Sequence, residues 1–140
     1  MAVEIKEIVL EATLENLYAV NDFIEKLIAP LGCVQEKRIQ LDVAVEEIFV
    51  NIANYAYEPG QGRATVQAEI MAAPPSIRIA FIDEGRQYNP LLGEPPNLAQ
   101  HLKERKVGGL GLLFVKKNVD SIDYEYRGGK NILTLWKKLS

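Results

Sequence analysis

The segment IRIAFI at residues 77–82 constrains the fold more than any other part of the chain, because it is almost wholly apolar. A short apolar run rich in β-branched residues is typical of a strand near the middle of a sheet. A Pro-Pro pair at 74–75 precedes the run and an Asp-Glu-Gly turn at 83–85 follows it. The sequence therefore predicts a central strand at residues 76–82, which needs further strands on both sides.

Apolar spacing predicts the elements around this strand. Further strands are expected at residues 3–10, 64–71, 122–127 and 131–139, and helices at 13–28, 36–57 and 110–119, with a short polar helix at 98–104. Gly128-Gly129 joins the last two strands as a hairpin. We expect one domain over residues 1–140, an α/β (α+β) two-layer sandwich with a mixed, mostly antiparallel sheet and helices on one face.

Composition fits an ordinary globular domain and narrows the function. Of the 140 residues, 48% are hydrophobic and 25% charged, which suits a chain with a core of its own. The net charge of −3, without a Lys/Arg stripe, argues against direct nucleic-acid binding. The lone Cys33 fits a reducing compartment, and neither a signal peptide nor a membrane-spanning run is present. We therefore expect a cytoplasmic protein that does not contact membranes.

Glu47 and Asn51 are the first candidate functional pair. They are four residues apart on a predicted helix, so their side chains share one face, which Asn54 and Tyr55 extend. A solvated helix face explains the pair equally well when it is taken alone. The pair becomes informative only together with the two segments that follow.

The turn after the central strand is the second candidate. Asp83 ends the apolar strand, where a carboxylate is well placed to accept a hydrogen bond from a ligand. Gly85 would let the backbone turn sharply or approach a flat ring closely. An ordinary turn is the alternative explanation.

A glycine-rich helix start is the third candidate. The run Gly108-Gly109-Leu110-Gly111 would expose backbone N–H groups at the positive end of a helix, which favours anion binding. Arg105 and Lys106 precede it and could neutralise phosphate charge. The spacing matches neither the dinucleotide pattern nor the P-loop, and a plain glycine-rich helix start remains an alternative.

In this order the three segments resemble the GHKL ATP-binding superfamily, which includes gyrase, MutL and histidine-kinase catalytic domains. LDVAVEEIFVNIANYAY resembles its N-box, DEGRQYNP its first glycine box and RKVGGLGLLFVKKNVD its second. Within the superfamily the chain is most similar to the anti-sigma-factor serine/threonine kinases of bacteria. The resemblance covers nearly the whole chain.

The resemblance implies a role for each matching residue. Glu47 would be the general base, Asn51 the Mg²⁺ ligand and Asp83 the acceptor for the adenine amino group. Gly85 would lie beside the adenine ring, residues 88–107 would form a lid, and either Asn131 or Thr134 would lie near the adenine. The full set of implied nucleotide contacts comprises Asn51, Asp83, Gly85, Tyr88, Arg105, Lys106, Gly108, Gly109, Leu110, Gly111 and Asn131.

The functional expectation that follows is an ATP- and Mg²⁺-dependent anti-sigma factor. It would phosphorylate a small anti-sigma-factor antagonist protein and bind a sigma factor. The resemblance also implies a possible homodimer. Tyr55 stands where many of these kinases carry His, and Tyr88-Asn89 where the first glycine box has Phe-Asp. An ATP-gated binding module with weak or no phosphotransfer is therefore the alternative. A histidine-kinase fragment is disfavoured, because the sole histidine, His101, falls in the predicted lid.

Overall fold

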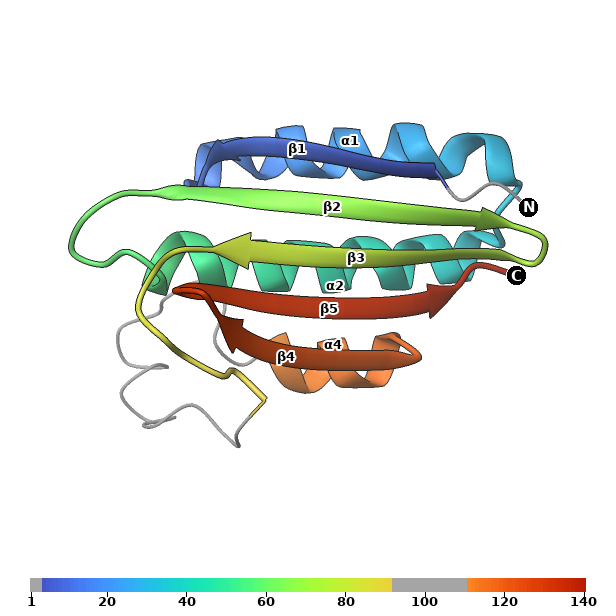
Figure 1. The fold of residues 1–140 in the computed structure, drawn as a ribbon. Coiled ribbons are helices and arrows are strands. Elements are labelled where there is room, and N and C mark those ends of the chain that lie inside the picture. Colours follow the sequence, from blue (N-terminus) through green and yellow to red (C-terminus); the bar gives the residue numbers. More distant parts are fainter. Residues whose placement is uncertain (1–3, 92–110) are drawn as a thin grey trace.

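The computed structural model describes residues 4–91 and 111–140, which form two layers (Figure 1). Five strands make one sheet in the order β1-β2-β3-β5-β4. Their bounds are β1 Glu4–Glu11, β2 Arg63–Ala72, β3 Pro75–Asp83, β4 Ser121–Arg127 and β5 Lys130–Lys138. The strand β3 pairs with β2 on one edge and β5 on the other, which confirms the predicted central strand.

Every strand pair among the described residues is antiparallel, so the expectation of a mixed sheet is wrong. The chain leaves β1, passes along two helices and returns to the same edge, so that β2 runs opposite to β1 (Figure 1). The strand that follows the last helix, β4, runs in the same direction as β3. It lies outside β5, which separates the two parallel strands.

The helices of the described residues all cover one face of this sheet, as expected (Figure 1). Their bounds are α1 Leu17–Ile28, α2 Gln35–Tyr55 and α4 Gly111–Asn118, with short 3₁₀ turns η1 at Leu14–Asn16 and η2 at Ala29–Leu31. The long helix α2 lies between α1 and α4 and runs along the strands, behind β3 and β5 (Figure 1). The two-layer α+β fold is thereby confirmed, whereas the helix expected at 98–104 lies outside the described residues.

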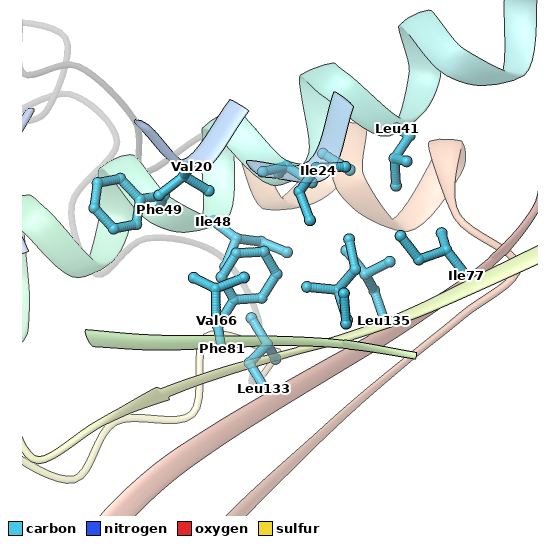
Figure 2. Packing of buried hydrophobic residues seen from close by; sticks show 14 of the residues in the cluster. Val20, Ile24, Leu41, Ile48, Phe49, Val66, Ile77, Phe81, Leu133 and Leu135 are labelled. Carbon is cyan, nitrogen blue, oxygen red and sulfur yellow. The ribbon is translucent and has the colours of Figure 1, made fainter. Parts of the chain in front are cut away.

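The core lies between the sheet and the helices (Figure 2). Its largest side chains alternate along the strands and recur at helical spacing on α1 and α2, so that each element turns one face inward. Figure 2 labels Val20, Ile24, Leu41, Ile48, Phe49, Val66, Ile77, Phe81, Leu133 and Leu135 in this cluster. Burial of such side chains provides the main favourable free energy of folding.

Lys137 is an exception in this apolar layer, because it is a buried cation that joins three elements. Its ammonium group donates hydrogen bonds to the side chain of Gln40 on α2, at 2.9 Å, and to the carbonyl of Asn118. Burial lowers the pKa of Lys137. Since Asn118 ends α4, the lysine holds the carboxyl end of that helix against α2 and β5.

No helix within residues 4–91 and 111–140 is both long and apolar enough to cross a membrane.

Candidate functional site

The ends of several helices and strands lie together at one end of the molecule, which is called this edge below. The carboxyl ends of α2 and β3, the amino end of α4 and the start of β5 all lie there, at the left of Figure 1. Two of the segments singled out in the sequence, the Glu47–Asn51 helix and the Asp83–Gly85 turn, therefore come together at this edge. The described start of α4, Gly111, lies at the same edge.

Asp83 is the buried acid of this edge. Its side chain lies on the helix-covered face of β3, and the residue is only 6% exposed. The carboxylate oxygen Oδ1 accepts hydrogen bonds from the backbone N–H of Gly85 and from Nδ2 of Asn131, both at 2.9 Å. Burial raises the pKa of Asp83, and these two hydrogen bonds oppose that rise. The site thus contains a desolvated carboxylate fixed by donors on one oxygen.

The side chain of Asn131 is hydrogen-bonded to several residues of this turn. Asn131 lies opposite Asp83 in the β3–β5 register and is also 6% exposed. Nδ2 donates further to the carbonyls of Arg86, at 2.9 Å, and Gly85, at 3.4 Å. Oδ1 accepts from the Tyr124 hydroxyl at 2.5 Å and from the backbone N–H of Tyr88 at 3.1 Å.

The same register separates the two residues that sequence left as alternatives. Thr134 pairs with Ala80, well inside the strand, and alternates with the buried Leu133 and Leu135. Its side chain is therefore on the sheet face turned away from the helices. Asn131, and not Thr134, is the residue beside Asp83.

Gly85 is a glycine because the turn packs directly against the end of α2. A Cβ atom at this position would lie 2.1 Å from the carbonyl oxygen of Ala56, which is far inside a normal contact. That carbonyl also accepts a hydrogen bond from the N–H of Arg86, at 3.0 Å. The close approach expected at Gly85 thus includes a helix of the protein itself, and it fixes the turn relative to α2.

Tyr57 is a second link between α2 and the turn, and the sequence had given it no role. Its hydroxyl accepts a hydrogen bond from the N–H of Glu84, at 2.7 Å, and donates one to the carbonyl of Arg63, at 2.5 Å. A Cβ at Gly62 would lie 2.3 Å from the Tyr57 ring. The aromatic residue just after the helix, followed by a Gly-x-Gly turn, was the only local signal for this contact.

Glu47 and Asn51 lie on α2, and both are half-buried. With a rise of about 1.5 Å per residue, Asn51 is roughly 7–8 Å and Glu47 roughly 13–14 Å along the helix from Ala56. Asp42 and Glu46 face α1, since they line a groove with residues of that helix. At about 100° per residue, Asn51 points about 180° from Asp42, which is the flank toward α4.

The surroundings of Glu47 favour its protonated form. Burial raises the pKa of Glu47, and the neighbouring carboxylate of Glu46 raises it further. A carboxylate whose pKa is raised accepts a proton more readily than an exposed one. The Glu47 carboxylate is therefore a stronger base than that of an exposed glutamate.

The remaining predicted residues are only partly covered by the structure. Tyr88 is 50% exposed, and its backbone N–H is tied to Asn131. Arg105, Lys106, Gly108, Gly109 and Leu110 lie outside the described residues, as does the part of the predicted lid beyond residue 91. Within the described ranges, no group of three or more His, Cys, Asp or Glu side chains could hold a metal ion.

The described residues form an antiparallel sheet covered by helices on one face, with a buried acid at the edge where α2, β3 and α4 meet. The chain belongs to the histidine kinase-like ATPase domain family, whose model matches residues 10–137. ATPase domains of this family bind ATP. The resemblance to the GHKL superfamily seen in the sequence is thereby confirmed.

One curated relative is a serine/threonine-protein kinase, and two solved structures share the fold. The chain is 29% identical over 98 residues to the serine/threonine-protein kinase BtrW of Bordetella bronchiseptica. The aligned residues cover 70% of this chain and 68% of BtrW. The fold is also similar to the RsbU and RsbW domains of a Mycobacterium tuberculosis protein, with a TM-score of 0.65 and 20% identity. That match covers 97% of this chain but only 32% of the mycobacterial one.

A second solved structure shows the same fold in a different setting. The histidine kinase domain of a blue-light activated kinase from Erythrobacter litoralis matches with a TM-score of 0.58 and 16% identity. It covers 89% of this chain and 60% of that one. At these identities the two structures establish the fold alone, which hosts more than one activity.

Proposed function

We propose that this chain is an ATP- and Mg²⁺-dependent serine/threonine kinase that phosphorylates a small anti-sigma-factor antagonist protein and binds a sigma factor in another state. The observation that carries the proposal is the buried Asp83 carboxylate, fixed by Gly85 and Asn131 at the edge where α2 ends. The likeness to a serine/threonine-protein kinase supports the type of reaction.

Asp83 would recognise the base. Both hydrogen bonds that the described residues make to its carboxylate end on Oδ1, so Oδ2 is the oxygen offered to the amino group of adenine. An ionised carboxylate only accepts hydrogen bonds, and it therefore favours a base with an amino group at this position. The fixed turn at Gly85 keeps the carboxylate in place before the ligand arrives.

Asn51 would hold Mg²⁺ against the phosphates. Mg²⁺ prefers oxygen ligands and retains several waters, so one amide oxygen with phosphate oxygens is a sufficient set. The absence of an acidic metal cluster among the described residues agrees with a cation held largely by the nucleotide. Arg105, Lys106 and the Gly108–Gly111 backbone would neutralise the phosphates, a role that rests on the sequence pattern and the family likeness.

Glu47 would orient the attacking hydroxyl and accept its proton. Bound ATP supplies the phosphoryl group, and transfer depends chiefly on positioning and charge neutralisation by the protein. Glu47 lies one helical turn from Asn51 on the flank toward α4, within reach of the same ligand. Residues 88–107 would close over the nucleotide as a lid within a single domain of residues 1–140.

Phosphotransfer tests the role of Glu47. The chain would be incubated with labelled Mg²⁺–ATP and small antagonist proteins encoded by neighbouring genes. We expect Glu47→Gln to lower the transfer rate by about 10²-fold or more, the usual contribution of a general base, without loss of ATP binding. Glu46→Gln is the matched control, because this neighbour faces α1, and it should transfer normally at pH 7.5. Normal labelling by Glu47→Gln contradicts the assigned role.

The pH profile gives the same proposal a second readout. Because burial and Glu46 raise the pKa of Glu47, transfer should fall with decreasing pH at a pH above the ordinary glutamate value of about 4.3. Glu46→Gln removes one cause of the rise, so it should move this acid limb to lower pH. An acid limb that is unchanged in Glu46→Gln would argue that a group other than Glu47 is titrating.

Tyr55 favours a second candidate function, an ATP-gated binding module with weak or no phosphotransfer. This residue stands where many anti-sigma-factor kinases carry His. ATP would then order the lid and set the affinity for a protein partner, such as a sigma factor or a second copy of the chain. Tight Mg²⁺–ATP binding without a phosphorylated antagonist would select this alternative.

The proposed cytoplasmic location and the absence of nucleic-acid and membrane partners are common to both functions.

A further inference from the structure

We propose that Tyr124 and Asn131 are positioning residues that select the purine base, by holding Asp83 as an acceptor for an amino group rather than for a 6-oxo group. This inference rests on the proposed ATP site. It adds Tyr124, a residue of the edge strand β4 that no sequence motif includes, to the determinants of nucleotide specificity.

The amide of Asn131 has one orientation that its neighbours permit. On one side, Nδ2 meets three groups that only accept hydrogen bonds, namely Oδ1 of Asp83 and the carbonyls of Gly85 and Arg86. On the other side, Oδ1 meets two donors, the Tyr88 N–H and the Tyr124 hydroxyl. A flipped amide would place its oxygen against three acceptors, which is strongly unfavourable in a buried site.

Tyr124 fixes this orientation from the far side of the site. Its hydroxyl lies 2.5 Å from Oδ1 of Asn131 and is half-buried. Burial raises the pKa of Tyr124, so the hydroxyl stays protonated and continues to donate. The hydrogen bonds therefore run in one direction, from Tyr124 to Asn131 and from Asn131 to Asp83.

The consequence for Asp83 is that a hydrogen bond from Asn131 stabilises the ionised form of its buried carboxylate. Two hydrogen bonds lower the pKa of Asp83 and so oppose the effect of burial. The one from the Asn131 side chain lowers it more than the one from the Gly85 N–H. Without the hydrogen bond from Asn131, Asp83 would bind a proton at higher pH and become a donor. A protonated acid donates to the O6 atom of a 6-oxo purine, whereas the ionised acid accepts from the adenine amino group.

Several other ionisable groups lie on the elements around Asp83. They are Tyr57 after α2, Arg63 at the start of β2, Glu84 in the same turn, Tyr124 on β4 and Lys130 at the start of β5. Glu84 and Lys130 approach each other at 4.0 Å, so their opposite charges partly cancel. The proposed variants leave all these groups in place except Tyr124.

The test compares Mg²⁺–ATP with Mg²⁺–inosine triphosphate, which has a 6-oxo group and no amino group. Dissociation constants would be measured by calorimetry for the full chain, Tyr124→Phe and Asn131→Val, at pH 7.5 and pH 6. We expect Tyr124→Phe to weaken ATP binding by about 3- to 10-fold, the effect of one lost hydrogen bond, and Asn131→Val by more. Inosine triphosphate binding should change by less than about 2-fold, and the loss of preference should be greater at pH 6.

Tyr126→Phe is the matched control, because it removes a hydroxyl from the same strand outside this set of hydrogen bonds. It should leave both dissociation constants unchanged. Tyr124→Phe removes a single oxygen, and it carries the test if Asn131→Val does not fold.

Equal losses for the two nucleotides, or an unchanged preference for ATP, would overturn the inference. If the unsubstituted chain prefers ATP and both variants keep that preference, only the positioning role fails. If the unsubstituted chain binds neither nucleotide, the proposed function fails with it.

Discussion

At the scale of single residues, the buried carboxylate of Asp83 connects folding with function. Burial makes the ionised form costly, and the pKa of Asp83 is raised accordingly. Two hydrogen bonds to Oδ1 recover part of that cost. Such an arrangement is expected where a side chain is retained for a ligand rather than for stability.

Asp83→Asn should separate these two roles. A raised folded pKa means that the carboxyl favours the folded state below its unfolded pKa of about 3.9, and that this contribution is lost as the pH rises through the folded pKa. The amide is neutral throughout and its Oδ1 can still accept both hydrogen bonds. We therefore expect Asp83→Asn to have a higher Tm than the unsubstituted chain at pH 7, with the difference vanishing near pH 4.

The same variant should bind ATP at least about tenfold more weakly, because an amide N–H₂ group would face the adenine amino group. Thermal unfolding by circular dichroism and calorimetric titration check the two halves. A variant that is less stable at pH 7 but binds ATP normally would mean that Asp83 serves the fold alone.

Sequence reasoning reached some of these residues and missed others for a physical reason. Asp83, Gly85 and Asn131 could be chosen because each stands at a recognisable place, the end of a strand or the matching position of a family pattern. Tyr57 and Tyr124 could not, because their roles arise from contacts across the fold. The Tyr57 hydroxyl bonds to Glu84, 27 residues away, and no local pattern specifies that pairing.

At the scale of secondary-structure elements, the contact between Gly85 and Ala56 joins the helix that carries Glu47 and Asn51 to the strand that carries Asp83. The turn and the helix end share the Ala56 carbonyl, which accepts the Arg86 N–H. Tyr57 repeats the connection through Glu84 and Arg63. The spacing between the proposed metal ligand, Asn51, and the proposed base-binding residue, Asp83, is therefore set by a packed junction rather than by a flexible loop.

Gly85→Ala should disturb this junction. The added Cβ would meet the Ala56 carbonyl oxygen at 2.1 Å, so the turn must move away from α2. We expect a loss of about 1–3 kcal/mol in the free energy of unfolding, measured in urea, together with weaker ATP binding. Gly32→Asn is the control: Gly32 has a positive φ that Asn tolerates, and no atom lies within 4 Å of an added Cβ. A fully stable Gly85→Ala protein would contradict the close packing described here.

Element types were predictable because periodicity is a local property. The strands expected at 64–71 and 76–82 are observed at Arg63–Ala72 and Pro75–Asp83, and the helix expected at 36–57 is observed at Gln35–Tyr55. Strand direction was not predictable in the same way. Whether β4 joins β3 directly or lies beyond β5 depends on long-range pairing, and the mixed sheet was therefore expected wrongly.

At the scale of the whole molecule, the sheet brings distant segments to one edge. The register of β3 with β5 places Asn131 opposite Asp83, and α2 ends beside the same turn. A second feature lies elsewhere, a groove between α1 and α2 lined by Tyr18, Asn21, Asp22, Glu25, Asp42 and Glu46. The carboxylates of this groove would repel an anionic nucleotide. Its residues can therefore serve as a negative control when the nucleotide site is located experimentally.

The measurement that tests the central claim most directly is a titration of the ¹⁵N-labelled chain with Mg²⁺–ATP, followed by amide chemical shifts. The proposed site predicts saturable shifts at Asn51, Asp83, Gly85, Tyr88 and Asn131, with little change at Asn21 and Asp22 in the α1–α2 groove. Shifts concentrated in that groove, or no shift at millimolar Mg²⁺–ATP, would contradict an ATP site at the edge formed by α2, β3 and α4.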